Sequence, residues 1–210
     1  MSRKAVFLDR DGTIIPNTGG FSADPDVEPL LEAIDAIKRL RAAGFLIVVV
    51  SNQSGVARGY YTEGELAAMH EALLEKFADA GAPIDAIYYC PHHPTEGTAP
   101  EYTIDCDCRK PRPGMFIRAA EERDIDLAAS YMVGDAERDI EAARAAGCKG
   151  TAVIMPDQLD TFPLDFATGA QWQQMMAEME NAAETGADAI VPDVEVAANW
   201  ILEMEAQENG

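Results

Sequence analysis

Two aspartates stand close together near the start of the chain, in the segment Asp9-Arg10-Asp11-Gly12-Thr13. They directly follow the apolar run of residues 5–8, which predicts a buried strand. Two carboxylates that share one site do not both ionise easily, so the pKa of one of them rises. Such a pair suits a nucleophile and a general acid. Without the preceding strand, the same segment would indicate an ordinary Asp-Gly turn.

A second group of reactive side chains lies in a long proline-containing loop in the middle of the chain. One residue separates Cys90 from His92, and one separates Cys106 from Cys108, so three sulfurs and an imidazole are available for tetrahedral zinc. His93 is an alternative ligand to His92. The alternative to a metal site is that the three cysteines are unlinked thiols in a loop. Four protein ligands leave no open position, so this zinc would hold the loop and not catalyse.

The elements that must position these groups alternate between strands and helices. Apolar runs predict strands, whereas helical spacing with glycine or capping residues at its ends predicts helices. The predicted strands are 5–8, 45–50, 86–89, 131–133, 152–154 and 189–191, and the predicted helices are 30–40, 62–80, 115–123, 140–146 and 194–205. This alternation is typical of a parallel α/β sheet covered on both faces. Ligands of such sheets bind beyond the carboxyl ends of the strands, where Asp9, Ser51 and Asp135 would meet.

Four short motifs occur in order at the predicted strand ends. They are Asp9-Arg10-Asp11-Gly12-Thr13, then Ser51 after Ile47-Val48-Val49-Val50, then Lys110, and finally Gly134-Asp135 followed by Asp139. In this combination the chain resembles the haloacid dehalogenase superfamily of phosphatases. The resemblance implies a Rossmann-like parallel sheet with helices on both faces, a zinc-binding loop and no large cap domain. We expect a single domain over residues 1–210, with the zinc loop at 90–114.

The resemblance also implies how these residues divide the chemistry. Asp9 would attack phosphorus and form an aspartyl phosphate, while Asp11 would protonate the leaving oxygen and then activate water. Lys110 would offset negative charge, and Asp139 would orient Lys110 or the metal shell. Magnesium would be held by hard oxygen ligands, namely the carboxylates of Asp9 and Asp135 and the backbone carbonyl oxygen of Asp11.

Longer matches narrow the resemblance to the heptose 1,7-bisphosphate 7-phosphatases of lipopolysaccharide-core heptose synthesis. The matching stretches are Ser51-Asn52-Gln53-Ser54-Gly55-Val56-Ala57-Arg58-Gly59, Cys90-Pro91-His92-His93-Pro94 and Cys106-Asp107-Cys108-Arg109-Lys110-Pro111. The resemblance implies that zinc is bound by Cys90, His92, Cys106 and Cys108. It implies substrate contacts at Ser51, Asn52, Gln53, Ser54, Arg58, Arg109 and Lys110. Arg58 and Arg109 would grip the second phosphate bidentately.

Two other functions stay open at this point. The histidinol phosphatases are close relatives, but the thirteen residues between His92 and Cys106 resemble the longer zinc loop of the heptose enzymes. Another small sugar phosphate is compatible with the same motifs. A non-enzymatic, zinc-stabilised binding protein could share the fold, yet it would have no need of Asp9, Asp11, Lys110 and Asp135 together.

The formal net charge of −21 disfavours nucleic acid and anionic membranes as partners. Cations nevertheless gather in or beside the loops, which favours a focused site for an anionic substrate. These cations are Arg10, Arg58, Arg109, Lys110, Arg112 and Arg138. No apolar run approaches the ~20 residues of a membrane span, and no secretory signal is visible before the first strand. We therefore expect a cytoplasmic protein and a monomer.

Residues 157–188 interrupt the alternation of strands and helices and carry none of the four motifs. We expect an insertion at the edge of the sheet, which is more plausibly a helical decoration than a regulatory or dimer-forming element. The fourth cysteine, Cys148, stands apart from the other three. We expect it to be a small buried residue and not a metal ligand.

Overall fold

The computed structural model describes residues 2–17, 23–154 and 186–208. Six strands of this part form one parallel sheet, in the order β3-β2-β1-β4-β5-β6. The strands are β1 (Ala5–Leu8), β2 (Leu46–Asn52), β3 (Ala86–Cys90), β4 (Tyr131–Gly134), β5 (Gly150–Ile154) and β6 (Ala189–Val191). The helices are α1 (Leu31–Ala42), α2 (Glu63–Asp79), α3 (Gly114–Arg123), α4 (Glu137–Ala146) and α6 (Val194–Glu208), with a 3-10 helix at Leu127–Ala129. The predicted parallel α/β sheet is confirmed.

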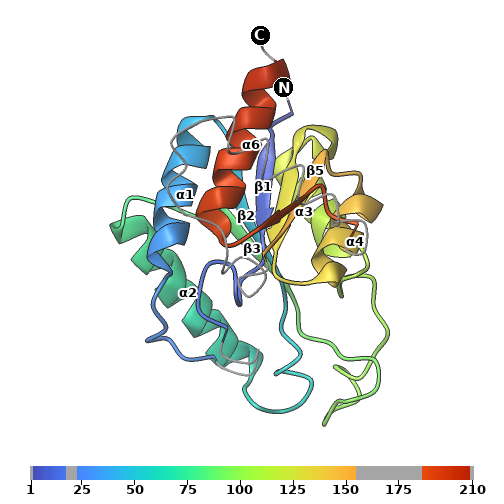
Figure 1. Ribbon diagram of the computed structural model, residues 1–210. Helices are drawn as coiled ribbons and strands as arrows, with labels where there is room; N and C mark the ends of the chain where they lie inside the picture. Colours follow the sequence, from blue (N-terminus) through green and yellow to red (C-terminus); the bar gives the residue numbers. More distant parts are fainter. Residues whose placement is uncertain (1, 18–22, 155–185, 209–210) are drawn as a thin grey trace.

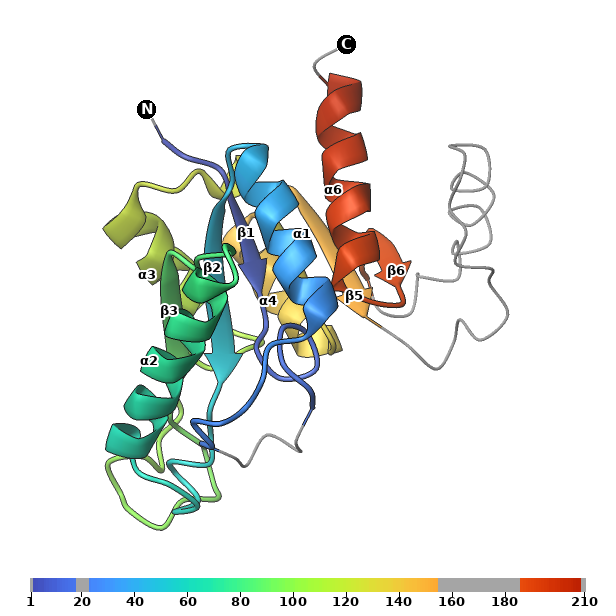
Figure 2. The same cartoon turned by 90° about the vertical axis from the view of Figure 1, so that its left-hand side faces the viewer.

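Helices cover both faces of this sheet (Figures 1 and 2). Val6 and Leu8 of β1 pack in the core beneath α1, α2 and α6, whereas Ala5 and Phe7 pack in the core beneath α3 and α4. This division follows because successive side chains of a strand project to opposite faces. All four side chains are fully buried, so the central strand has no face toward solvent.

The helix ends follow the local sequence signals, with one difference. The predicted capping box of α2 is present, because Glu65 N donates to Thr62 Oγ1 at 3.1 Å and Thr62 N donates to Glu65 Oε2 at 2.7 Å. Helix α4 begins at Glu137, one turn before the predicted start at residue 140. The Asp139 carboxylate accepts a hydrogen bond from Ala136 N at 3.1 Å, which stabilises this additional first turn.

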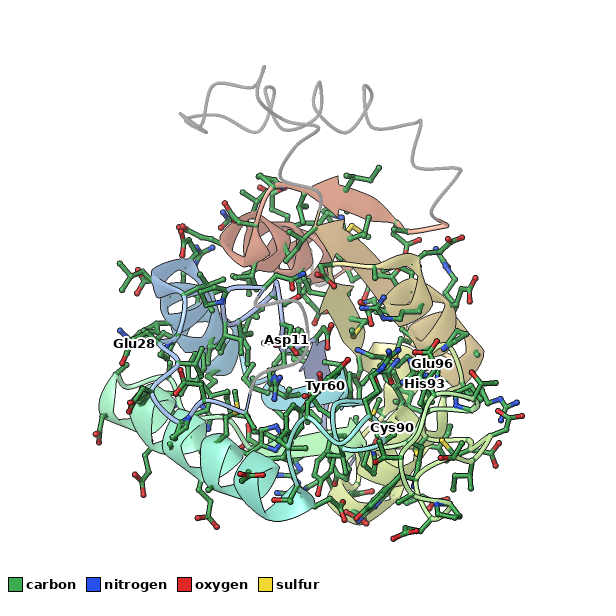
Figure 3. The ribbon with its side chains drawn as sticks, turned by 90° about the horizontal axis from the view of Figure 1, so that it is seen from below. Asp11, Glu28, Tyr60, Cys90, His93 and Glu96 are labelled. Carbon is green, nitrogen blue, oxygen red and sulfur yellow. The ribbon has the colours of Figure 1, made fainter. Side chains whose placement is uncertain are left out.

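Strand β1 lies between β2 and β4, with Leu8 opposite both Val49 and Val133. The backbone N–H of Asp9 donates to the carbonyl oxygen of Val133 at 2.9 Å and continues the pairing beyond the strand. The residues that follow β1, β2 and β4 therefore meet at one edge of the sheet. Figure 3 views this edge from below, with Asp11 near its centre.

The long loop between β3 and α3 packs against the segment that follows β2. Ala57 N donates to Pro91 O at 3.1 Å, and Thr98 N donates to Ala57 O at 2.7 Å. Thr98 also contacts the loop at Gly59, where a Cβ atom would lie 3.0 Å from Thr98 Oγ1. The region around Arg58 is thus held by the loop that carries the cysteines.

Most of the predicted insertion at 157–188 lies outside the described residues. Its last part is described at Asp188, whose carboxylate accepts hydrogen bonds from Thr151 N at 2.8 Å and Thr151 Oγ1 at 3.0 Å. Among the described helices, none has the length and apolar character to cross a membrane.

Candidate active site and metal centres

A tight loop after β1 carries the two aspartates. Ile14 N and Ile15 N both donate to Arg10 O, at 3.0 and 3.2 Å, and Gly12 N donates to Ile15 O at 2.9 Å. Gly12 has a φ of +76°, a conformation that glycine adopts without steric cost. A Cβ atom at this position would lie 2.4 Å from Asp135 Oδ2. Glycine is therefore required both for the turn and for the approach of Asp135.

Lys110 is buried between two carboxylates at the floor of the site. Its Nζ lies 2.9 Å from Asp9 Oδ1 and 2.6 Å from Asp139 Oδ1, and it donates to Val50 O at 2.7 Å. Burial alone would lower the pKa of Lys110, but Asp9 and Asp139 outweigh burial and raise the pKa above its usual range. The predicted role of Asp139 in orienting Lys110 agrees with this contact.

Asn52 holds the backbone of Lys110 with both ends of its side-chain amide. Asn52 Nδ2 donates to Lys110 O at 3.0 Å, and Lys110 N donates to Asn52 Oδ1 at 3.0 Å. Asn52 also lines the cleft with Ser51. Asn52 was predicted only to contact the substrate, and the structure adds that its side chain fixes the backbone of Lys110.

Asp9, Asp135 and Asp139 form a carboxylate cluster whose ligand atoms lie within 4.8 Å of one another. Burial, together with the charges of Asp9 and Asp139, raises the pKa of Asp135 to about 6. Asp135 Oδ1 is buried and accepts no hydrogen bond from the described residues, while Arg138 Nη2 lies 3.9 Å away. A hard divalent cation would relieve this repulsion and satisfy the buried oxygen, so the donor set fits magnesium. The Asp11 carboxylate does not belong to this cluster.

The Asp11 carboxylate is instead held by its own neighbour in the sequence. Arg10 Nε donates to Asp11 Oδ2 at 3.1 Å and Arg10 Nη2 donates to Asp11 Oδ1 at 3.0 Å. The Arg10 side chain is fully buried. Arg10 was one of the cations predicted in or beside the loops, and it stands in the loop after β1. Its guanidinium faces Asp11 and has no exposed surface, so it is not available to a substrate.

A cleft of about 260 Å³ opens over these groups. The residues that line it come from the loop after β1, from the end of β2, and from the loop and helix that follow β4, and they are Asp9, Asp11, Asn17, Ser51, Asn52, Asp135 and Arg138. Arg138 was among the cations that favoured a site for an anionic substrate, and the structure places it in this lining. Asn17 was not predicted as a site residue, and its place in the sequence shortly after the two aspartates is the signal that could have identified it.

The other predicted substrate residues lie outside this lining. Gln53 is fully buried, with Nε2 at 3.0 Å from Asp11 Oδ2, so its predicted contact with substrate does not fit its position. Ser54 is half-buried in the turn that leads to Arg58. Arg58 is ion-paired with Glu96, and Arg109 Nη1 donates to His92 O at 3.1 Å. The two arginines are thus attached to the loop of the cysteines, beside the cleft.

The structure brings Cys90, His92, Cys106 and Cys108 together, with all four ligand atoms within 4.8 Å of one another. Cys106 Sγ lies 3.5 Å from Cys90 Sγ and 3.2 Å from Cys108 Sγ, and His92 Nδ1 lies 3.3 Å from Cys108 Sγ. Ligands in a zinc tetrahedron are about 3.6 to 3.8 Å apart for the usual Zn–S and Zn–N bond lengths. The donor set and its spacing fit a closed structural zinc site.

His93 is engaged elsewhere, so the choice between the two histidines favours His92. His93 Nδ1 accepts a hydrogen bond from Glu96 N at 2.9 Å, and its Nε2 lies 3.4 Å from Arg58 Nη2. Figure 3 shows His93 beside Glu96 on the loop, next to Cys90. Contacts with Cys90, Cys106 and His92 outweigh burial and lower the pKa of Cys108 to about 5, whereas contact with Cys108 raises the pKa of Cys90 and burial raises the pKa of Cys106. Cys108 is therefore the thiol of this group that ionises most readily, and zinc binds thiolates.

Cys148 lies apart from this cluster. It is half-buried and packs against the core beneath α3 and α4. Burial raises the pKa of the Cys148 thiol to about 12, so the group is a weakly reactive packing residue. The structure thus places Cys148 away from the four clustered side chains, and half-buried where a small buried residue was predicted.

Comparison with known proteins agrees with this geometry. The chain is 45% identical over 152 residues to the D-glycero-beta-D-manno-heptose-1,7-bisphosphate 7-phosphatase of Pasteurella multocida, covering 72% of this chain and 82% of the relative. It is 47% identical to the enzyme of the same name from Escherichia coli K12, covering 72% and 78%. Residues 107–155 match the HAD-hydrolase-like family. The chain belongs to the haloacid dehalogenase-like hydrolases.

Solved structures of this family share the architecture. D,D-heptose 1,7-bisphosphate phosphatase from B. bronchiseptica, crystallised with magnesium and phosphate, matches with a TM-score of 0.71 and 32% identity, covering 96% of this chain and 99% of the other. The corresponding Burkholderia thailandensis phosphatase matches with a TM-score of 0.59 and 27% identity, covering 95% and 99%. The haloacid dehalogenase-like fold predicted from the motifs is therefore confirmed.

Proposed function

We propose that this protein is a magnesium-dependent phosphatase that removes the 7-phosphate of D-glycero-D-manno-heptose 1,7-bisphosphate, in lipopolysaccharide-core heptose synthesis. The observation that carries the proposal is the buried Lys110, paired with both Asp9 and Asp139 at the floor of the cleft. The curated relatives are named for the β anomer, so the β anomer is the proposed substrate. A cytoplasmic location and a monomeric state belong to the same proposal.

Asp9 is the nucleophile of the proposed reaction. An Asp9 carboxylate oxygen bonds to phosphorus as the bond from phosphorus to the sugar oxygen breaks, and Asp11 gives its proton to that oxygen. Asp11 then takes a proton from the water that cleaves the aspartyl phosphate. Lys110 balances the negative charge that Asp9 and the phosphoryl group bring together, while Ser51 and Asn52 offer hydrogen-bond donors at the cleft wall.

The carboxylates of Asp9 and Asp135, with the backbone carbonyl oxygen of Asp11, are the proposed magnesium ligands. Magnesium, when bound, would neutralise charge on the transferred phosphoryl group. Cys90, His92, Cys106 and Cys108 are the proposed zinc ligands. This site would fix the loop that carries Arg109 and holds the segment of Arg58, and these two arginines are the proposed contacts of the second phosphate.

Turnover of several phosphorylated substrates tests the proposal. Heptose 1,7-bisphosphate, histidinol phosphate and a set of other sugar phosphates should be compared in the presence of magnesium, with the position of the remaining phosphate determined by NMR. We expect preferential hydrolysis of the bisphosphate and retention of the 1-phosphate. A preference for histidinol phosphate would contradict the substrate and leave the phosphatase chemistry standing.

The Asp9→Asn variant tests the mechanism. An amide cannot serve as the nucleophile, so we expect turnover of every substrate to be abolished in a variant that still folds and binds zinc. Near-normal turnover would contradict the assignment of Asp9. Absence of phosphatase activity in the wild type would favour a zinc-stabilised binding protein.

A further inference from the structure

Four polar side chains that do not line the cleft form a buried network around the Asp11 carboxylate. They are Arg10, Gln53, Tyr61 and His70, each less than a tenth exposed, and we call them the Asp11 support. They come from the loop after β1, the end of β2, the segment before α2, and α2 itself. Four side chains from these four places therefore converge on one carboxylate.

Arg10 uses all three guanidinium nitrogens inside this network. Nε and Nη2 donate to the two oxygens of Asp11, while Nη1 lies 3.2 Å from His70 Nε2 and 3.5 Å from Met69 Sδ. Burial and the charge of Arg10 lower the pKa of His70 to about 3, so the ring is neutral and its Nε2 accepts from Arg10. α2 thereby fixes the plane of the guanidinium that faces Asp11.

Gln53 holds the same carboxylate from the end of β2. Its Nε2 donates to Asp11 Oδ2 at 3.0 Å and to Ser51 Oγ at 2.8 Å, and its Oε1 accepts from the Tyr61 hydroxyl at 2.9 Å. The Tyr61 ring sits against Gly55, where a Cβ atom would lie 2.3 Å from it. The orientation of the Gln53 amide is therefore determined by the tyrosine behind it.

A buried charge is costly unless it is paired, and a well-packed apolar group would serve the core as well. A polar network with every member satisfied restricts its side chains to one arrangement. In this protein the network ends at the Asp11 carboxylate, which lines the cleft but lies outside the cluster of Asp9, Asp135 and Asp139. Precise placement of Asp11 is the property that this network supplies.

We propose that Arg10, Gln53, Tyr61 and His70 are positioning residues for proton transfer, which aim the Asp11 carboxyl group at the leaving oxygen of the substrate. The inference rests on the proposed function, in which Asp11 protonates that oxygen as its bond to phosphorus breaks. It predicts a dependence on the leaving group, because 4-nitrophenolate departs readily without a proton, whereas unsubstituted phenolate and an alkoxide are poorer leaving groups that gain from protonation.

The test compares kcat/KM of the magnesium-loaded enzyme for 4-nitrophenyl phosphate, phenyl phosphate and heptose 1,7-bisphosphate. Arg10→Lys and Gln53→Leu should lose ~10- to 100-fold on the two poorer leaving groups, as expected when a catalytic group is displaced. On 4-nitrophenyl phosphate the same variants should lose less than ~3-fold, because general-acid assistance is not needed there. Tyr61→Phe, which removes only the hydroxyl that holds Gln53, should show a smaller loss with the same order among substrates.

Phe77→Leu is the matched control, since Phe77 is a fully buried residue of α2 with no part in the network. Phe77→Leu should lower the Tm without changing the ratio of kcat/KM between the substrates. Equal losses on all three substrates, or no loss on any, in Gln53→Leu and Tyr61→Phe would overturn the proposal even if Arg10→Lys does not fold. The comparison of 4-nitrophenyl phosphate with phenyl phosphate is enough to test the positioning role. If the wild type does not hydrolyse the heptose bisphosphate, that result contradicts the proposed substrate and not the positioning role.

Discussion

At the scale of single residues, Lys110 keeps a full positive charge with a side chain that has no exposed surface. It is the ion-pair partner of Asp9, the proposed nucleophile, and of Asp139, which is equally buried. Asn52 fixes its backbone from the neighbouring strand end. Position 110 therefore tolerates no residue that is shorter or uncharged, because an unpaired buried carboxylate would remain.

Arg109 and Arg138 are expected to differ in their effects on specificity. Arg109→Ala should lower kcat/KM for heptose 1,7-bisphosphate by about one to two powers of ten, the equivalent of roughly 1.5–3 kcal/mol for a charged hydrogen bond. It should change turnover of a small monophosphate much less, because only the bisphosphate carries the second phosphate. Arg138→Ala should lower both equally, since Arg138 lines the cleft with Asp9.

Steady-state kinetics with both substrates on each variant would check this prediction. Arg118→Ala is the control, because Arg118 pairs with Glu122 on the surface of α3 and should leave both values unchanged. Equal losses for Arg109→Ala on the two substrates would assign Arg109 to the reacting phosphate.

The raised pKa of Asp135 predicts that the stabilisation of the protein by magnesium depends on pH. Its folded-state pKa of about 6 lies above the ordinary value of 3.8, so its contribution to stability is present at low pH and is lost as the pH rises through 6. A bound cation offsets that loss. We therefore expect magnesium to raise the Tm by several degrees more at pH 8 than at pH 5, at roughly 2 to 4 °C per kcal/mol for a chain of this size.

Differential scanning calorimetry of the zinc-containing protein, with and without magnesium, would measure the increase in Tm caused by magnesium at pH 5 and at pH 8. In Asp135→Asn the carboxylate that titrates is absent, so the extra stabilisation at pH 8 should disappear. A magnesium effect that is equal at both pH values in the wild type would contradict the prediction.

At the scale of elements, we expect the loop between β3 and α3 to depend on bound zinc for its stability. We expect about one equivalent of tightly held zinc per chain, because four protein ligands close the site. Cys106→Ser should lower both zinc content and Tm, and the double variant Cys106→Ser, Cys108→Ser should lose the zinc. Elemental analysis of protein purified without added zinc would measure this, with Cys148→Ser as the control that keeps it. Full zinc content in the double variant would contradict the ligand set.

Much of the fold could be predicted because its signals are local. The apolar runs of β1 and β2, the Thr62–Glu65 cap and the Gly44 turn each depend on a few neighbouring residues. The order of the strands does not, since β1 meets β4 only across more than a hundred residues. In the site, too, some features follow from local sequence and others from distant contacts. Short motifs identify Asp9, Asp11, Lys110 and Asp135, whereas the burial of Arg10 depends on contacts with α2.

At the scale of the whole molecule, the segment at 157–188 is expected to be dispensable for the chemistry. Among the residues that the structure describes, those that line the cleft all precede it in the sequence. Replacing residues 157–184 by a short Gly/Ser linker should leave much of the turnover intact, since loop length has a small effect on stability. Activity and the content of both metals would check this. Complete loss of catalysis in a folded, metal-loaded variant would show that the segment closes over the substrate.

The position of β1 between β2 and β4 also has a consequence for a chain that is still being made on the ribosome. Asp9 is made long before β4, and its amide cannot pair with Val133 until the chain has grown past β4. The four proposed zinc ligands are all present about twenty-five residues earlier in synthesis, because the last of them is Cys108. A nascent chain that stops between Cys108 and Val133 would therefore carry every proposed zinc ligand and an incomplete catalytic centre.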